Sequence, residues 1–167
     1  FARAIMTTDS HPKQMAISLD VSGSRVILGG AAKGSAMLHP NMATMLCFIA
    51  TDAPVEQTFL QQALRESVGA SFNMTDVDGN QSTNDTVLVL ANGQAGGTEV
   101  GADSPAAGPF QEALTYICTD LAKELVRDGE GAQRLIEVVV EAASTLDEAR
   151  FAAREIAPTL KGTIQDF

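Results

Sequence analysis

The sequence of 167 residues has no tryptophan, one tyrosine and two cysteines, and aromatic residues make up only 5% of it. A hydrophobic core must therefore be built mainly from aliphatic residues and methionine, within the 45% of residues that are hydrophobic. This apolar content excludes a disordered chain. The length fits one domain, residues 1–167.

Clusters of lysine and arginine are also missing, and the formal net charge is −10. Proteins bind nucleic acid by neutralising phosphates with such clusters, so no nucleic-acid partner is expected. No window has the long apolar run of a membrane span. The first residues, FARAIMTTD, lack the pattern of a signal peptide and are typical of the middle of a strand, as if upstream sequence were missing.

The two cysteines, Cys47 and Cys118, lie in the apolar stretches TMLCFIA and LTYICTDLA. These surroundings favour two small buried thiols in a reducing compartment, with a disulfide or a nucleophilic cysteine as the alternative. Neither His-rich nor paired-Cys spacing occurs, so the sequence predicts no metal site.

Apolar residues alternate in the first half of the chain, which is the pattern of strands. Strands are predicted around residues 4–6, at 15–19 and at 25–30. Residues 31–42 are rich in turn-forming types and predict an irregular loop. The continuous apolar run 44–51 then predicts a strand buried on both faces.

Helical spacing of apolar residues begins after this strand. Residues 55–68 predict a helix with Asp52 as its N-cap and Pro54 in its first turn, ended by Gly69. Residues 110–126 predict a second helix.

The remaining elements complete the fold prediction. Strands are expected at residues 86–91 and 134–141, and a last helix is expected to start at Ser144 or Thr145 and to stop before Pro158. Strands followed by alternating helices and strands predict an α+β domain with helices packed on a sheet.

The segment KGSAMLHPNMATML, residues 33–46, is the main candidate for chemistry. It contains Lys33 in a glycine-containing loop and brings Ala43 and the hydroxyl of Thr44 to the start of a predicted strand. Alone, these residues favour ordinary roles, because β-branched residues commonly open strands and lysines are commonly solvated.

This segment resembles the processing site of the ornithine acetyltransferase family (bifunctional glutamate N-acetyltransferase and ornithine acetyltransferase). In that family a lysine lies eleven residues before the nucleophilic threonine, as Lys33 does before Thr44. Three more blocks resemble the family in the same order: IMTTDSHPKQ at 5–14, DVDGNQSTNDTVLVLANG at 76–93 and RDGEGA at 127–132. The resemblance implies a layered helix/sheet/sheet/helix self-processing acyltransferase fold, with this chain as a central segment that is incomplete at both ends.

The resemblance also implies a mechanism. The chain would break between Ala43 and Thr44, and the hydroxyl of Thr44 would be the nucleophile. Scission frees the α-amine of Thr44, which has a reference pKa of about 8 and can accept the hydroxyl proton near neutral pH. Such a threonine needs no histidine partner, so His11 and His39 are interpreted as loop residues.

The implied reaction is a ping-pong transfer of acetyl from N-acetylornithine to glutamate in arginine biosynthesis, through an acetyl-threonine ester. Thr7 and Lys33 would bind substrate with Thr44, and Lys33 would meet a carboxylate. Glu130 would recognise a substrate ammonium, with a solvated turn carboxylate as the alternative. Ser82–Asp85 is interpreted as turn scaffolding. No cofactor is implied, although acetyl-CoA is an alternative acetyl donor.

The chain departs from the family pattern at Ala36, where a glycine is common, and at Asn80-Gln81, where Asp-Thr is common. The family's oxyanion donors lie upstream of Phe1 and further substrate residues lie beyond Phe167. Expected partners are therefore the remaining α and β segments, in a homo- or hetero-oligomer in the cytoplasm, or in the mitochondrial matrix of a eukaryote. Two other readings stay open: a non-catalytic fragment or assembly module, and an amidohydrolase or aminopeptidase of the same fold.

Overall fold

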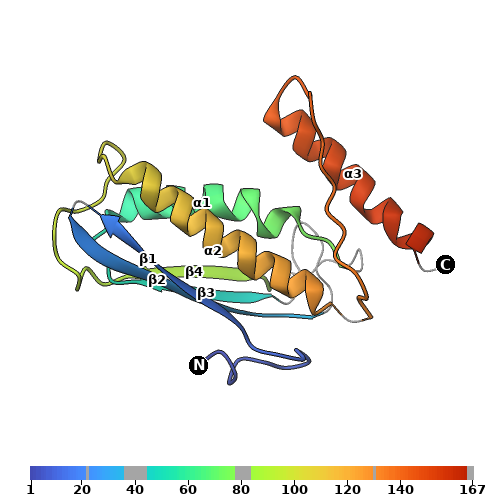
Figure 1. Ribbon diagram of the computed structural model, residues 1–167, viewed down its shortest axis with the longest axis horizontal. Coiled ribbons are helices and arrows are strands. Elements are labelled where there is room, and N and C mark those ends of the chain that lie inside the picture. Colours follow the sequence, from blue (N-terminus) through green and yellow to red (C-terminus); the bar gives the residue numbers. More distant parts are fainter. Residues whose placement is uncertain (22, 36–44, 78–83, 130, 165–167) are drawn as a thin grey trace.

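The computed structural model describes residues 1–21, 23–35, 45–77, 84–129 and 131–164, with side chains as far as Pro158. Its elements in chain order are β1 (Lys13–Val21), β2 (Ser24–Lys33), β3 (Leu46–Thr51), α1 (Gln57–Ala70), the short 3-10 helix η1 (Phe72–Met74), β4 (Thr86–Ala91), α2 (Ala107–Arg127) and α3 (Leu146–Ile164). The strands form a sheet in the order β1-β2-β3-β4, and α1 and α2 lie side by side on one face of it (Figure 1). The predicted α+β class is confirmed.

The sheet combines both kinds of strand pairing. β1 and β2 form an antiparallel hairpin, in which the carboxylate of Asp20 accepts a hydrogen bond from the backbone N–H of Gly23 at 2.9 Å. β2 and β3 are also antiparallel, whereas β3 and β4 are parallel. Parallel neighbours need a long crossover connection, and α1 supplies it.

The hydrophobic core lies between the sheet and the two helices. Val26 and Leu28 of β2 point into it and are fully buried. Gly30, next on the same face, allows α2 to approach closely, since a Cβ atom there would lie 3.0 Å from Leu121 Cδ1 and 3.2 Å from Ile117 Cγ2. The helical layer is thus held directly against the centre of the sheet.

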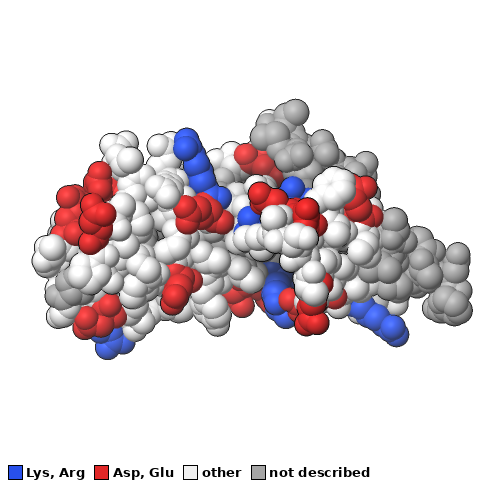
Figure 2. Space-filling view, turned by 90° about the horizontal axis from the view of Figure 1, so that it is seen from above, with Lys and Arg blue, Asp and Glu red and all other residues white. Residues whose placement is uncertain are grey.

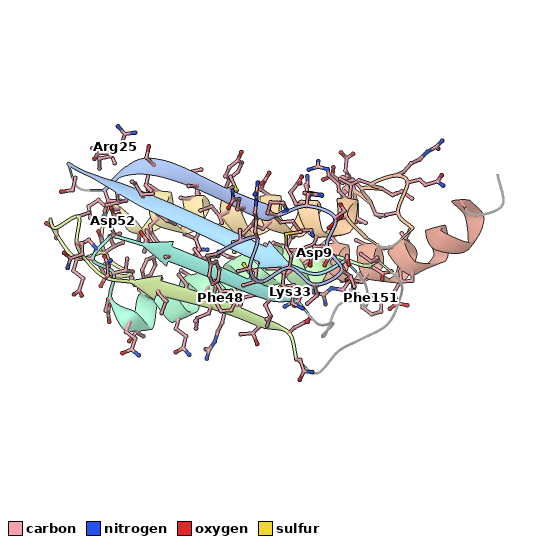
Figure 3. The ribbon with its side chains drawn as sticks, turned by 90° about the horizontal axis from the view of Figure 1, so that it is seen from below. Asp9, Arg25, Lys33, Phe48, Asp52 and Phe151 are labelled. Atoms are coloured by element: carbon pink, nitrogen blue, oxygen red, sulfur yellow. The ribbon has the colours of Figure 1, made fainter. Side chains whose placement is uncertain are left out.

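The opposite face of the sheet is only partly covered (Figure 3). Near Phe48 the N-terminal residues lie against it, and the ring of Phe1 packs edge-to-face on Phe48 with centroids 5.3 Å apart. Further along, Ile27 and Leu90 keep 52% and 60% of their surface exposed. For this reason the prediction that β3 is buried on both faces is wrong: Ala50 is exposed.

Two predicted strands are absent from the parts of the chain that the structure describes. Residues 4–6 form no strand: Ala4 ends a turn, in which its N–H donates a hydrogen bond to the Phe1 carbonyl at 2.8 Å. Residues 134–141 have no regular secondary structure, pair with no described strand and are mostly exposed. Alternating apolar residues give a strand only where a neighbouring backbone can complete the ladder, and neither segment has one here.

The helix boundaries also differ from the predictions. Asp52 does not cap α1, because its carboxylate accepts the Ile27 N–H at 2.7 Å, and the helix begins only at Gln57. Thr145 is confirmed as a cap of α3, with its hydroxyl accepting the Glu148 N–H at 3.2 Å. Pro158 lies inside α3 and does not stop it.

Both cysteines are free and buried, as predicted. Burial raises the pKa of the Cys118 thiol to about 12, and burial likewise raises that of Cys47. Among the described helices, none is long and apolar enough to cross a membrane. Acidic side chains are spread over the helical face with few basic ones between them (Figure 2).

Candidate active site

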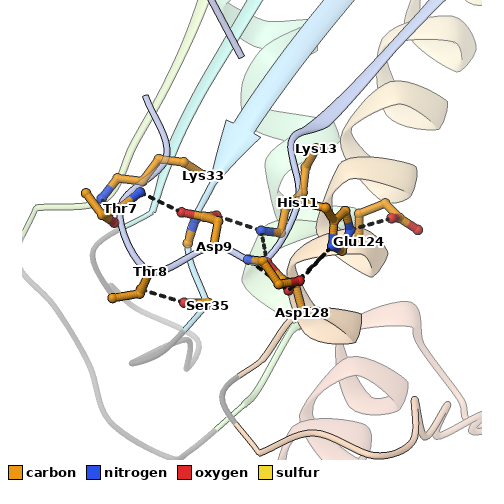
Figure 4. Close-up of polar contacts among 11 residues, drawn as sticks. Thr7, Thr8, Asp9, His11, Lys13, Lys33, Ser35, Glu124 and Asp128 are labelled. Atoms are coloured by element: carbon orange, nitrogen blue, oxygen red, sulfur yellow. Dashed lines mark hydrogen bonds and ion pairs between the residues drawn. The ribbon is translucent and has the colours of Figure 1, made fainter. Parts of the chain in front are cut away.

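Two of the predicted substrate-binding residues meet at one end of the sheet. Lys33 is the last residue of β2, and Thr7 lies in the N-terminal segment that precedes β1. The Lys33 ammonium donates a hydrogen bond to Thr7 Oγ1 at 3.5 Å (Figure 4). Beside them, the hydroxyls of Thr8 and Ser35 share a hydrogen bond of 2.6 Å.

The ammonium of Lys33 is buried without a carboxylate partner among the residues that the structure describes. Only 7% of this residue's surface is exposed, and its hydrogen-bond partner is the neutral hydroxyl of Thr7. A buried charge is normally neutralised, because leaving water is costly. The site is therefore suited to an anion, and a carboxylate fits the donors of a lysine and a threonine.

Asp9 holds the backbone of both segments that carry these two residues. Its Oδ2 accepts the N–H of Thr7 at 3.1 Å, and its Oδ1 accepts the N–H of Gly34 at 2.7 Å. The same Oδ1 accepts a hydrogen bond from the ammonium of Lys13 at 2.6 Å. Burial raises the pKa of Asp9, but the hydrogen bonds from Gly34, Lys13 and Thr7 outweigh it and lower the pKa to about 2.

Lys13 continues the network to the end of α2. Its buried ammonium also pairs with Asp128, which in turn accepts hydrogen bonds from the N–H and hydroxyl of Ser10. Burial of Asp128 acts to raise its pKa, but these hydrogen bonds lower it overall. The ring of His11 extends the network to Glu124, with Nε2 lying 3.4 Å from Glu124 Oε2.

The start of β3 is fixed beside Lys33. The sheet register pairs Lys33 with Leu46, which is two residues after Thr44 in the sequence. The N–H of Met45 donates to Asp85 Oδ1 at 2.7 Å, and its carbonyl accepts the Thr86 N–H at 3.0 Å. The described backbone thus places the start of β3, which follows the predicted nucleophile in the sequence, beside the backbone of Lys33.

Three predicted site residues, Ala43, Thr44 and Glu130, lie outside the described residues. The same is true of His39 and of the departures at Ala36 and Asn80-Gln81. His11, interpreted from sequence as a loop residue, takes part in the polar network around Asp128.

The sequence did not single out Asp9, Lys13, Asp128 or Asp85. The first three lie within the blocks that carry the family resemblance, and their opposite charges were the available indication that they pair. Asp85 was interpreted as turn scaffolding, and it does bind a backbone N–H, but that of Met45, which immediately precedes β3. Within the described part of the chain, no group of three His, Cys, Asp or Glu side chains could hold a metal ion.

Comparison with known proteins identifies the family. A model of the ArgJ family matches residues 1–161. The "Arginine biosynthesis bifunctional protein ArgJ" of Dehalococcoides mccartyi (strain CBDB1) is 53% identical over 157 residues, covering 94% of this chain and 39% of that protein. The protein of the same description from Symbiobacterium thermophilum is 55% identical over 155 residues, covering 93% of this chain and 39% of its own length.

A solved structure supports the same assignment. The crystal structure of the arginine biosynthesis bifunctional protein argJ from Bacillus halodurans aligns with a TM-score of 0.62 and 42% identity, over 64% of this chain and 50% of that chain. Fold and site define an α+β protein with a buried cationic site at one end of its sheet. The chain belongs to the ArgJ family, as its four sequence blocks predicted. It spans about two fifths of the length of the curated relatives, 39% in the two cases above.

Proposed function

We propose that this chain carries the nucleophile and part of the substrate site of an enzyme that transfers an acetyl group from N-acetylornithine to glutamate. Thr44 is the nucleophile, freed by scission of the Ala43-Thr44 bond. Thr7 and Lys33 bind the substrate carboxylate, and Glu130 meets a substrate ammonium. Membership of the ArgJ family and the description of its relatives as arginine biosynthesis bifunctional proteins support the proposal.

The observation that carries the proposal is the buried ammonium of Lys33. It lies against the Thr7 hydroxyl, without a carboxylate partner among the described side chains. The backbone of Lys33 pairs with Leu46 at the start of β3. N-acetylornithine and glutamate both have an α-carboxylate, so one cation can serve both half-reactions. A charge-assisted hydrogen bond to that carboxylate would supply the missing partner.

The proposed scission begins with attack of the Thr44 hydroxyl on the carbonyl carbon of Ala43. The peptide C–N bond breaks as the C–O bond forms, and the proton passes to the nitrogen, giving an ester and a free α-amine. Water then hydrolyses the ester, leaving a carboxylate on Ala43 and restoring the hydroxyl of Thr44. Because the free amine has a reference pKa of about 8, it can serve as the base in later steps.

In the transfer, the hydroxyl of Thr44 attacks the acetyl carbonyl of N-acetylornithine. The amide C–N bond breaks, ornithine leaves with the proton on its amine, and acetyl remains as an ester on Thr44. The amine of glutamate then attacks this ester, so that N-acetylglutamate leaves and the hydroxyl regains a proton. In this proposal the donors that stabilise the oxyanion come from other parts of the full-length protein.

The test is product formation by the full-length protein given N-acetylornithine and glutamate. Thr44→Ala should abolish formation of N-acetylglutamate, whereas Thr58→Ala, which alters an exposed threonine of α1, should leave it unchanged. Release of free acetate in place of N-acetylglutamate would favour an amidohydrolase. Absence of turnover would favour a non-catalytic role, and full activity of the Thr44→Ala variant would remove the proposed nucleophile.

A further inference from the structure

The proposed chemistry leaves three buried charges unused, those of Asp9, Lys13 and Asp128. The side chains of Asp9 and Lys13 are 0% exposed and that of Asp128 only 5%. Lys13 lies between the two carboxylates and pairs with both (Figure 4). The three residues come from the N-terminal segment, β1 and the end of α2, and so join parts of the chain far apart in sequence.

Stability alone is a weak reason for such a cluster. Buried ion pairs often stabilise a protein no more than apolar residues of the same volume, because desolvation offsets the attraction. Asp128 is moreover the C-cap residue of α2, where the partial negative charge of the helix end disfavours a carboxylate. A requirement to hold neighbouring backbone segments in a fixed geometry explains the cluster better.

The geometry at Asp9 indicates what is fixed. One carboxylate binds the N–H of Thr7 through Oδ2 and the N–H of Gly34, the residue after Lys33, through Oδ1. The separation of the Thr7 hydroxyl and the Lys33 ammonium therefore depends on Asp9. Neither Asp9 nor its partner Lys13 reaches the surface of the site, because both side chains are fully buried.

We propose that Asp9 is a positioning residue, braced by Lys13 and Asp128, that sets the distance between Thr7 and Lys33 for recognition of the substrate carboxylate. The inference rests on the proposed function. It extends the site from the residues that meet substrate to the ionic cluster that holds them. Asp128 also lies two residues before Glu130 in the sequence, so the same cluster anchors the segment leading to that residue.

The test compares steady-state kinetics of Asp9→Asn and the unsubstituted full-length protein. The variant keeps the size of the side chain but loses the charge that pairs with Lys13. We expect KM for N-acetylornithine and for glutamate to rise about tenfold, the effect of one weakened charge-assisted hydrogen bond. A merely structural loss would reduce the folded fraction and the apparent kcat but leave KM unchanged, which would overturn the inference.

Asp52→Asn is the matched control. Asp52 also accepts a backbone N–H of β2, that of Ile27, but at the opposite end of the strand from Asp9 (Figure 3). Its variant should lose stability and keep both KM values. An equal rise of KM in the two variants would contradict a specific role of Asp9.

A double substitution tests whether Asp9 acts through Lys33. If it does, Asp9→Asn should raise KM less than about twofold in a Lys33→Met background, because the interaction that it positions is already absent. A full tenfold effect in that background would overturn the inference. If Asp9→Asn fails to fold, the Asp128→Asn variant tests the inference instead. We expect its KM to rise about threefold, and an unchanged KM would contradict the positioning role.

The proposed function and the positioning role fail in different ways. No acetyl transfer by the unsubstituted protein would overturn both. Normal KM values in folded Asp9→Asn, with acetyl transfer intact, would overturn the positioning role alone.

Discussion

At Lys33, the proposed binding of a substrate carboxylate would carry a cost to the stability of the free protein. Its ammonium is buried, and among the described residues it is met by the hydroxyl of Thr7 rather than a carboxylate. The free protein therefore bears a desolvation cost that a bound anion would relieve. Binding and stability should respond to its removal in opposite directions.

Substitution of Lys33 by Met tests this opposition. We expect KM for both substrates to rise by about tenfold to a hundredfold, while the midpoint of thermal unfolding stays equal or rises, because a buried charge without a carboxylate partner among the described residues is removed. Enzyme kinetics and calorimetry of the full-length protein measure the two effects. Lys123→Met, which removes a lysine that is 41% exposed and pairs with Glu137, should change neither. A fall in stability with an unchanged KM would show that Lys33 is structural.

Asp9 predicts a specific dependence of stability on pH. Its pKa is lowered from 3.8 to about 2 in the folded state, so its ionised form stabilises the fold. That contribution, about 2 kcal/mol, is fully present above about pH 4 and is lost as the pH falls toward about 2. Denaturant unfolding should therefore show Asp9→Asn to be less stable than the unsubstituted protein at about pH 5, with the gap closing near about pH 2. A gap of the same size at both pH values would contradict this role.

The sequence predicted only part of the site for a physical reason. Thr7 and Lys33 were found through the blocks that resemble the family, and the structure brings them together. The pairing of Lys13 with Asp128 spans 115 residues and depends on how α2 packs against β1. No local spacing in the sequence indicates such a contact, so the cluster could be identified only from the structure.

At the scale of elements, the spacing between α2 and the sheet depends on a small residue. A Cβ atom on Gly30 would lie 3.0 to 3.2 Å from atoms of Leu121, Ile117 and Ile49, which is tighter than ordinary packing. Gly29, its neighbour, points to the other face, where a Cβ atom would lie 3.6 Å from that of Ala16. The two adjacent glycines should therefore differ in how well the fold tolerates a side chain at each position.

Gly30→Val should destabilise the fold by about 1 to 3 kcal/mol, because the added side chain forces α2 away from the sheet. Gly29→Ala is the paired control and should change the free energy of unfolding by less than about 0.5 kcal/mol. Denaturant titration measures both. Equal effects of the two substitutions would mean that α2 does not pack on Gly30 as described.

Elements with strong local patterns were predicted well, whereas those that depend on neighbours were not. The apolar stripe of α2 predicted a helix at 110–126, within three residues of the observed Ala107–Arg127 at each end. Residues 134–141 have equally good strand composition but no pairing partner in the described chain. Asp52 was expected to cap α1 but binds β2, because a tertiary hydrogen bond replaced the local one.

At the scale of the whole molecule, β3 and α2 share one core. Cys47 belongs to β3 and Cys118 to α2, and both are fully buried in it. Burial raises the pKa of each thiol, so neither a reactive thiolate nor access for a reagent is expected in the folded state.

Thiol labelling should therefore report opening of the entire core. We expect both cysteines to react with an alkylating reagent at one common rate that follows global unfolding, and to be protected under native conditions. Mass spectrometry of quenched samples measures singly and doubly labelled species. Rapid labelling of one thiol in the native protein would contradict a single shared core.

The chain matches its ArgJ relatives over 39% of their length, so the proposed chemistry is best examined in the full-length protein. Intact-mass spectrometry before and after incubation with N-acetylornithine is the most direct measurement. We predict two fragments that meet between Ala43 and Thr44, and one added acetyl group on the fragment that begins with Thr44. An uncleaved chain, or an acetyl group at any other residue, would contradict Thr44 as the nucleophile.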